Sequence, residues 1–238
     1  MHVGFMPPGG DDGLHVHQDE DESMYLISGE LEVTIGDLQF RMRPGESYFA
    51  PRNTPHRLRN VGTAEARSLH IDTPGRFSCF PKKPVYKCEV ETYMFFGVPT
   101  VIHLSGSETG NEFSLFESFM TGGCDSGLHV HANEDECIYL QTGELEVTVG
   151  DRSFTLKAGT DYFIPRNTPH RLRNKRVKNA RVLHVNSPAT LDPFIRLAGI
   201  RIKGPDEVVF AYPTPEQIGP ILLLSEEYDF HMLIPPGM

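Results

Sequence analysis

The sequence predicts an all-β protein in which two barrels or jelly rolls follow one another along the chain. Three observations support this fold class. One long segment occurs twice, each copy contains runs of alternating apolar and polar residues, and turn signals separate those runs at short intervals. With 238 residues, the chain is long enough for two domains that each have their own core.

The internal repeat is the strongest of these signals. Residues 13–60 align with residues 127–174 without a gap, at a constant offset of 129 − 15 = 114. Roughly two-thirds of the aligned positions are identical, which is far more than unrelated segments would show. Two copies at so long a period indicate a duplicated domain rather than a solenoid.

Each copy has the pattern of short strands joined by tight turns. Residues 31–35 alternate apolar and polar side chains, as do residues 145–149. Gly36-Asp37 and Gly150-Asp151 are typical of hairpin turns. Residues 48–50, which Pro51 follows, are expected to form a short buried strand, and the second copy repeats this pattern.

The two copies differ in what precedes them. Residues 93–104 and 112–120 are expected to be the opening strands of the second barrel. In the first barrel, residues 3–7 correspond to residues 112–120, and nothing corresponds to residues 93–104. An unpaired barrel edge invites aggregation, so another segment should complete the first barrel. The candidates are residues 85–90, residues 228–234 or a second copy of the chain, so a homodimer is among the expected assemblies.

These patterns predict the domain organisation. Three prolines and no clear periodicity in residues 73–90 indicate a linker, and helical spacing follows the second copy in residues 188–200 and 215–224. We therefore expect a first barrel at residues 1–74, a linker at 75–91, a second barrel at 92–190 and a C-terminal extension with short helices at 191–238.

Four residues in each copy have the chemistry of a metal site. His15 and His17, at i and i+2 on an expected strand, should point to the same face, and Glu22 and His56 follow. The second copy repeats the set at the same spacings with His129, His131, Glu136 and His170. Neutral imidazoles and a carboxylate suit one divalent transition metal ion per barrel, namely Fe, Mn, Ni, Co, Cu or Zn. Four protein ligands leave two positions open on an octahedral ion.

The residue types leave the carboxylate ligand open. Glu22 follows Asp19, Glu20 and Asp21, and the second copy has Glu134 and Asp135 before Glu136. An acidic run of this kind is also typical of a solvated turn.

Other repeated residues have structural interpretations beside functional ones. Tyr25 and Tyr139 face either the pocket or the core. His70 and His184 lie in apolar strands and should be hydrogen-bonded core residues. Asn60 and Asn174 should brace the strand backbone.

Composition narrows the partners and the compartment. The formal net charge of −10 disfavours a nucleic acid partner, and no run of about 20 apolar residues predicts a membrane helix. The N-terminus has no pattern of a secretory signal. The four cysteines form no C-x-x-C pair, so we expect mostly free thiols in a reducing, cytoplasmic compartment, with a Cys79–Cys88 disulfide as the alternative.

The repeated residues resemble the two motifs of a known superfamily, the cupins. The first cupin motif is matched by Gly13, His15, His17, Glu22 and Gly29, and the second by Gly45, Pro51, His56 and Asn60; both recur in the second copy. The chain therefore looks like a bicupin, which implies two cupin barrels, each a double-stranded β-helix. The resemblance favours Glu22 and Glu136 as the carboxylate ligands. Asn53 and Asn167 replace the usual glycine of the second motif, and asparagine tolerates the left-handed conformation.

The flanks of the second copy carry a more specific resemblance. Residues 101–117 and 187–194 look like the quercetinase-like cupins, which are similar to flavonol dioxygenases. This implies an enzyme, a metal-dependent dioxygenase that acts on a small enolisable or phenolic substrate, with Glu22 or Glu136 as the catalytic base. The alternatives are a metal-dependent isomerase or cyclase and a non-catalytic ligand-binding cupin. The complete ligand set in both copies argues against the last.

Overall fold

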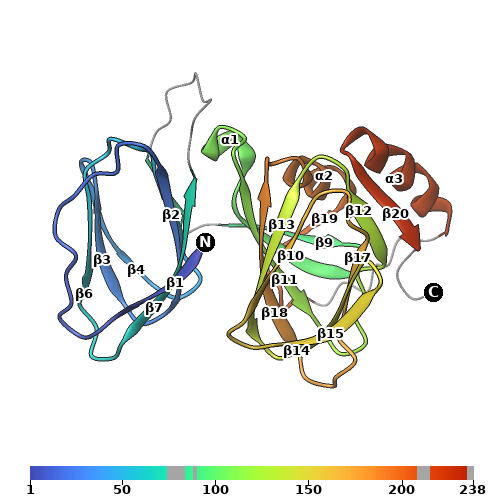
Figure 1. Cartoon of the computed structure of the whole chain (residues 1–238), viewed down its shortest axis with the longest axis horizontal. Coiled ribbons are helices and arrows are strands. Elements are labelled where there is room, and N and C mark those ends of the chain that lie inside the picture. Colours follow the sequence, from blue (N-terminus) through green and yellow to red (C-terminus); the bar gives the residue numbers. More distant parts are fainter. Residues whose placement is uncertain (74–83, 88–89, 208–214, 235–238) are drawn as a thin grey trace. The chain divides into compact units, whose positions relative to one another are not determined.

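The structure, a computed structural model, describes residues 1–73, 84–87, 90–207 and 215–234 (Figure 1). It consists mainly of antiparallel strands with a few short helices, which confirms the predicted all-β fold with two barrels in tandem. Contacts within the chain define two units, one formed by Met1–Glu89 with Ser107–Glu112 and the other by Val90–Gly106 with Phe113–Met238. Among the described residues, no helix is long and apolar enough to cross a membrane.

The first unit contains two facing sheets. One has the strand order β1-β7-β2-β5-β8 and the other has the order β4-β3-β6. The strands are β1 (His2–Met6), β2 (Asp21–Ser28), β3 (Leu31–Ile35), β4 (Leu38–Met42), β5 (Ser47–Ala50), β6 (His56–Asn60), β7 (Ala66–Thr73) and β8 (Val85–Lys87).

The second unit repeats this plan with additional strands. Its sheets have the orders β16-β13-β18-β11-β10-β9-β19 and β15-β14-β17-β12-β20. The strands are β9 (Glu91–Phe95), β10 (Val98–Leu104), β11 (Ser114–Met120), β12 (Leu128–His131), β13 (Asp135–Thr142), β14 (Glu144–Val149), β15 (Arg152–Lys157), β16 (Asp161–Ile164), β17 (His170–Arg173), β18 (Ala180–Ser187), β19 (Ile200–Ile202) and β20 (Phe230–Ile234). Its helices are α2 (Leu191–Ala198) and α3 (Pro215–Glu227), whereas most of α1 (Gly106–Thr109) belongs to the first unit.

The core of each barrel lies between its two sheets. In the first barrel, alternate residues of β3 (Leu31, Val33 and Ile35) point inward and are almost completely buried. Leu145 and Val147 do the same on β14 of the second barrel. The period-2 pattern of the sequence thus places one apolar face of each strand in the core and leaves the other for polar residues.

Two backbone features of the repeat explain particular residues. Gly29 has φ of +93°, and a Cβ atom there would lie 2.6 Å from the Cα atom of Ala66, so only glycine fits. Asn53 and Asn167 have φ of 61° and 59°, which confirms that asparagine takes the left-handed conformation at the position where the motif usually has glycine.

The segments outside the repeat differ in part from the prediction. Residues 93–104 form a hairpin, β9 and β10, because Phe96 and Gly97 both adopt positive φ and reverse the chain. The linker does supply a strand to the first barrel, because β8 pairs with β5. The prediction, however, expected a counterpart of residues 93–104, which would lie beside β1. The described residues place no strand on that outer edge of β1. Residues 230–234 pair with β12 of the second barrel instead of completing the first.

The cysteines are only partly described. Cys124 and Cys137 are free thiols. The alternative Cys79–Cys88 disulfide lies outside the described residues.

Candidate metal centres

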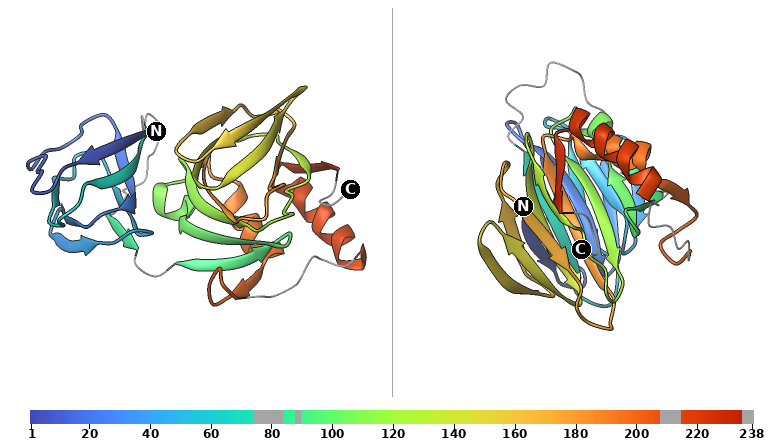
Figure 2. Two further views of the ribbon diagram at one scale, coloured as in Figure 1. Left: turned by 90° about the horizontal axis from the view of Figure 1, so that it is seen from below. Right: turned by 90° about the vertical axis from the view of Figure 1, so that its right-hand side faces the viewer.

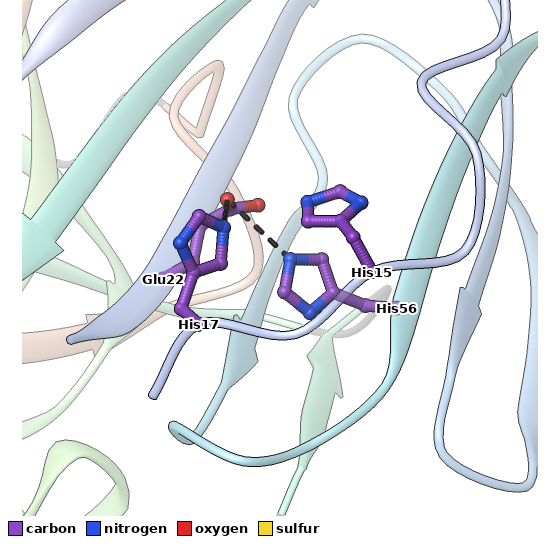
Figure 3. Close-up of side chains that lie close together, drawn as sticks. All are labelled: His15, His17, Glu22 and His56. Atoms are coloured by element: carbon purple, nitrogen blue, oxygen red, sulfur yellow. Dashed lines mark ion pairs between the residues drawn. The ribbon is translucent and has the colours of Figure 1, made fainter. Parts of the chain in front are cut away.

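The first barrel brings His15, His17, Glu22 and His56 together, as Figure 3 shows. One ligand atom from each side chain lies within 4.8 Å of all the others. Glu22 belongs to β2 and His56 begins β6, while the backbone of His15 forms an isolated bridge to His56. The expected strand at His15 and His17 is therefore reduced to one bridge in this barrel.

The second barrel brings His129, His131, Glu136 and His170 together with the same spread of ligand atoms. Here the two early histidines do lie on a strand, β12, because β20 pairs along its other side. All four side chains are buried, whereas His15 and His17 in the first barrel are half-buried. The C-terminal extension thus makes the second cluster the more enclosed of the two.

Backbone carbonyls fix the tautomer of four of the histidines. The Nδ1 atoms of His15 and His129 lie 2.9 and 3.0 Å from the carbonyl oxygens of Gly13 and Gly127. The Nδ1 atoms of His56 and His170 lie 2.9 Å from carbonyl oxygens two residues earlier. A carbonyl oxygen can only accept, so each Nδ1 carries the hydrogen and each Nε2 is left with its lone pair, as a metal-bound imidazole requires.

The acidic neighbours of the two glutamates have other partners. Glu20 and Glu134 lie 3.0 and 2.8 Å from the Nδ1 atoms of His17 and His131 and orient these rings. Asp21 and Asp135 form ion pairs with Arg52 and Arg166 at 3.1 and 2.8 Å. The geometry therefore selects Glu22 and Glu136 from the acidic runs that the residue types left open.

The inward-facing atoms of the clusters fit a cation. In the first barrel the Nε2 atoms of His17 and His56 lie 3.3 and 3.6 Å from Oε2 of Glu22, yet neither nitrogen has a hydrogen-bond partner. In the second, Nε2 of His170 and Oε2 of Glu136 are 2.8 Å apart, and both are buried without a hydrogen-bond partner. Lone pairs of neutral imidazoles that converge on a carboxylate oxygen are the donor set that a divalent transition metal takes.

Electrostatics keep the first carboxylate ionised. Burial of Glu22 favours its neutral form, but its interactions with His56 and Tyr48 outweigh this and lower its pKa to about 2. The Tyr48 hydroxyl donates a hydrogen bond to Oε1 of Glu22. Burial and the neighbouring Glu22 charge raise the pKa of Tyr48 well above its usual range, so the phenol keeps its proton.

The second carboxylate is held by a different donor. Burial disfavours the charge of Glu136, but His170 and His184 outweigh it and hold its pKa well below the usual range. Nδ1 of His184 lies 2.6 Å from Oε1 of Glu136. Burial and the neighbouring His170 and His131 keep the pKa of His129 well below its usual value, which favours the neutral ring that a metal needs.

The remaining repeated residues have structural roles, and one of them also contacts the second cluster. Asn60 and Asn174 brace the backbone as predicted, because their side-chain amides donate to the carbonyl oxygens of Met6 and Met120, both at 2.8 Å. Tyr139 is buried and does not line the pocket described below, which favours the core interpretation. His184 is buried and hydrogen-bonded, as predicted, but its partner is the candidate ligand Glu136 and its side chain also lines a pocket.

A pocket opens onto the second cluster. Its polar end holds His129, His131, Glu136 and His184, and aromatic and aliphatic side chains form most of the remaining wall. The apolar lining residues are Phe95, Phe96, Val98, Phe116, Met120, Leu172, Leu191 and Phe230.

The C-terminal extension supplies part of this wall. Phe230, on β20, lies with its ring centroid 5.0 Å from that of His129 and 5.3 Å from that of His131. The strand and helix α3 lie beside the second barrel in both views of Figure 2. Sequence reasoning missed this role because nothing in residues 215–234 resembles the repeat.

Comparison with known proteins places the chain in a family. The model of the cupin domain matches residues 3–72 and 115–186, so the chain belongs to the cupin family and carries two cupin domains. The match covers both candidate metal centres.

Individual relatives indicate the range of proteins that share this sequence and fold. Protein SchB of Streptomyces halstedii is 34% identical over 67 residues, 28% of this chain and 49% of SchB, so the match spans about half of that relative. An H2HPP isomerase of Bacillus subtilis is 25% identical over 189 residues, which is 78% of each chain. A variant of oxalate decarboxylase from Bacillus subtilis has the same fold, with a TM-score of 0.66 at 18% identity over 79% of this chain and 68% of the other. Mn(II) centres are described in that decarboxylase.

Proposed function

We propose that the second barrel is a metal-dependent active site that isomerises a small, largely apolar, enolisable or phenolic compound by proton transfer. The observation that carries this proposal is the pocket of the second barrel, which has a histidine and carboxylate cluster at one end and a largely apolar wall of aromatic and aliphatic side chains elsewhere. An enclosed apolar site with a few convergent polar groups is the usual form of a small-molecule site.

The residues of the cluster have distinct roles in this proposal. His129, His131, Glu136 and His170 would hold a divalent ion, and such an ion would supply a Lewis acid for a substrate oxygen. Glu136 is the ionised carboxylate of the cluster, so it is the group able to accept a substrate proton, and its Oε2 atom would have to leave the ion to do so. The apolar wall excludes water from that proton transfer.

We assign the first barrel a structural metal site. His15, His17, Glu22 and His56 have the same donor set, but the flanking Leu14 and Val16 are 66% and 45% exposed. No strand among the described residues pairs there as β20 does on β12. Glu22 is the first barrel's counterpart of the base but lacks the apolar enclosure.

The choice of isomerisation rests on the relatives and on the pocket. The H2HPP isomerase aligns over 78% of both chains, so both barrels are shared with it. Decarboxylation of oxalate, which the structural relative's name indicates, would place a small dianion in the pocket. No Lys or Arg is among the described residues that line it, so no permanently charged side chain would join the metal ion in partnering a dianion.

A dioxygenase of the quercetinase-like kind is the second candidate. The observation that favours it is the same apolar wall, because an uncharged oxygen molecule and an electron-rich ring both partition into such an environment. The two candidates share the ligands and the base, and they differ in whether oxygen is consumed.

The test compares matched variants of the two barrels. Glu136→Gln and Glu22→Gln each keep one oxygen ligand and remove the basic carboxylate. Small β-diketones and flavonols are screened with the Fe, Mn, Co and Ni forms, in an oxygen electrode and under anaerobic conditions. We expect turnover without oxygen uptake, lowered about 10²–10⁴-fold by Glu136→Gln and little changed by Glu22→Gln.

Each part of the proposal has its own contradicting result. Turnover that stops without oxygen would select the dioxygenase. Full turnover in Glu136→Gln with metal retained would remove this residue as the base. Loss of turnover in Glu22→Gln alone would move the active site to the first barrel.

A further inference from the structure

Two histidines that correspond in the repeat have different environments. His70 and His184 lie at the same offset of 114, on β7 and β18. Nδ1 of His184 lies 2.6 Å from Oε1 of Glu136, whereas Nδ1 of His70 lies 4.0 Å from Oε1 of Glu22. In the first barrel Tyr48 supplies the hydrogen bond to the carboxylate instead.

The other ring nitrogen differs as well. Nε2 of His70 forms a hydrogen bond with Oγ of Ser68 at 2.9 Å. The position that corresponds to Ser68 is 68 + 114 = 182, where the second barrel has Val182, a fully buried core residue that cannot form a hydrogen bond. Nε2 of His184 is buried and has no hydrogen-bond partner among the described residues.

The neighbours of the rings account for the difference. A Cβ atom at Gly4 would lie 2.8 Å from Nε2 of His70, so the first barrel accommodates this ring by having glycine there. The second barrel has Ser118 at the corresponding position, and the His184 ring stacks on Phe116 with centroids 4.6 Å apart and planes within 11°. Packing therefore holds the imidazole with one nitrogen on Glu136 while its side chain lines the pocket.

We propose that His184 is a substrate-binding residue, and that its Nε2 atom forms a hydrogen bond with the hydroxyl group of a small aromatic ligand in the pocket of the second barrel. This proposal rests on the proposed function and specifies its substrate class. The side chain is only 9% exposed, and a buried polar atom without a partner is costly, so a ligand that supplies one is favoured over a ligand that does not. A hydroxyl group can donate or accept, so it suits Nε2 whichever role the ring takes.

The shape of the pocket agrees with a ring at this place. Phe95, Phe96 and Phe230 form a wall on which a flat apolar ring can pack edge-to-face or offset. The polar atoms of the ligand then face His184 and the metal cluster. An aliphatic ligand would fill the same space without these ring contacts.

The experiment measures ligand selectivity rather than turnover. Phenol and toluene are nearly equal in shape and differ in the hydroxyl group, and their affinities for the full chain are measured by ligand-observed NMR titration. Because toluene is the more apolar, the phenol-to-toluene affinity ratio of each variant is compared with that of the wild type. Metal content and melting temperature are recorded for each variant, so that only folded protein is compared.

Three variants separate His184 from its surroundings. His184→Phe keeps the ring stack but removes the nitrogen, and Val182→Thr places a hydroxyl where Ser68 satisfies the counterpart histidine. Val182→Ala removes side-chain volume without adding a hydroxyl and is the matched control. We expect the ratio to fall about tenfold, which is about 1.4 kcal/mol, in His184→Phe and in Val182→Thr, and to stay near the wild-type value in Val182→Ala.

The contradicting results are distinct from failure of the proposed function. A ratio within twofold of the wild type in His184→Phe or in Val182→Thr would overturn the role of His184. A wild-type ratio that collapses when the metal is chelated would assign the hydroxyl to the ion instead and would also overturn it. Neither result depends on Glu136→Gln turnover, which tests the proposed function.

Discussion

Phe230 joins the C-terminal extension to the second metal cluster, and Phe230→Ala tests whether this segment closes the pocket. The ring is 4% exposed and packs near the rings of His129 and His131. It also lies 5.6 Å from the ring of Phe194 on α2. Its removal should therefore loosen β20 from β12 and expose the cluster.

The size of the effect follows from the burial of this ring. Replacing a buried Phe by Ala costs about 3–5 kcal/mol. The strand lies at the edge of its sheet, so we expect the loss to appear as local opening rather than as global unfolding. A loss of about 3 kcal/mol raises the population of the opened form about 10²-fold, because about 1.4 kcal/mol is a factor of ten.

Amide hydrogen exchange measures this opening. The amide of Ala132 donates to the carbonyl oxygen of Asp229 at 2.7 Å, and β12 pairs with β20 along residues 128–131. These amides should exchange about 10²-fold faster in Phe230→Ala, while those of β14 stay unchanged. Leu233→Ala is the control, because Leu233 lies on the same strand and is 52% exposed. Equal effects of the two substitutions, or unchanged exchange in Phe230→Ala, would refute the reasoning.

Three further predictions concern the clusters and the strand framework. His56→Ala and His170→Ala should each remove about one of two bound metal ions per chain in elemental analysis, because each site is built within its own barrel; the loss of both ions from one change would contradict this. His103 and Arg181 lower the pKa of Glu117 despite its burial, so this group stabilises the fold above its unfolded pKa of about 4.3 and the stability is lost as pH falls through the lower folded pKa. The melting temperature of Glu117→Gln should therefore be lower than that of the wild type at pH 7 and should depend less on pH below about 4. A pH profile of the melting temperature parallel to that of the wild type would count against this. Asn174→Ala should cost about 1–3 kcal/mol in denaturant unfolding, because it leaves the buried carbonyl oxygen of Met120 without its donor, and a cost below about 0.5 kcal/mol would argue against the bracing role.

The repeated segment let the sequence determine most of the framework. Alternating residues such as Leu31 and Val33 place one face of each strand in a core whatever the surrounding structure does. The spacing of His15 and His17 likewise brings two imidazoles to one side of an extended chain, and the matching set in the second copy repeats it. These are local regularities, so they can be recognised without knowing the contacts.

The tertiary structure decided what local patterns cannot express. In the sequence, only the resemblance to the cupin motif distinguishes Glu22 from Asp21 as the carboxylate ligand. In the structure, Asp21 forms an ion pair with Arg52, which leaves Glu22 as the carboxylate of the cluster. The hairpin at Phe96 and Gly97 depends on two positive φ angles, and a phenylalanine in the sequence does not predict the first of them.

The difference between the two metal centres is also a tertiary property. The repeats are about two-thirds identical in sequence, yet the pairing of β20 with β12 covers the second cluster, through residues about a hundred positions away along the chain. The His184 ring, which contacts Glu136, similarly stacks on Phe116 of a neighbouring strand. The sequence by itself therefore determined that there are two ligand sets. Long-range strand pairing decided which of them faces an apolar pocket, because burial depends on what the rest of the chain places over a site.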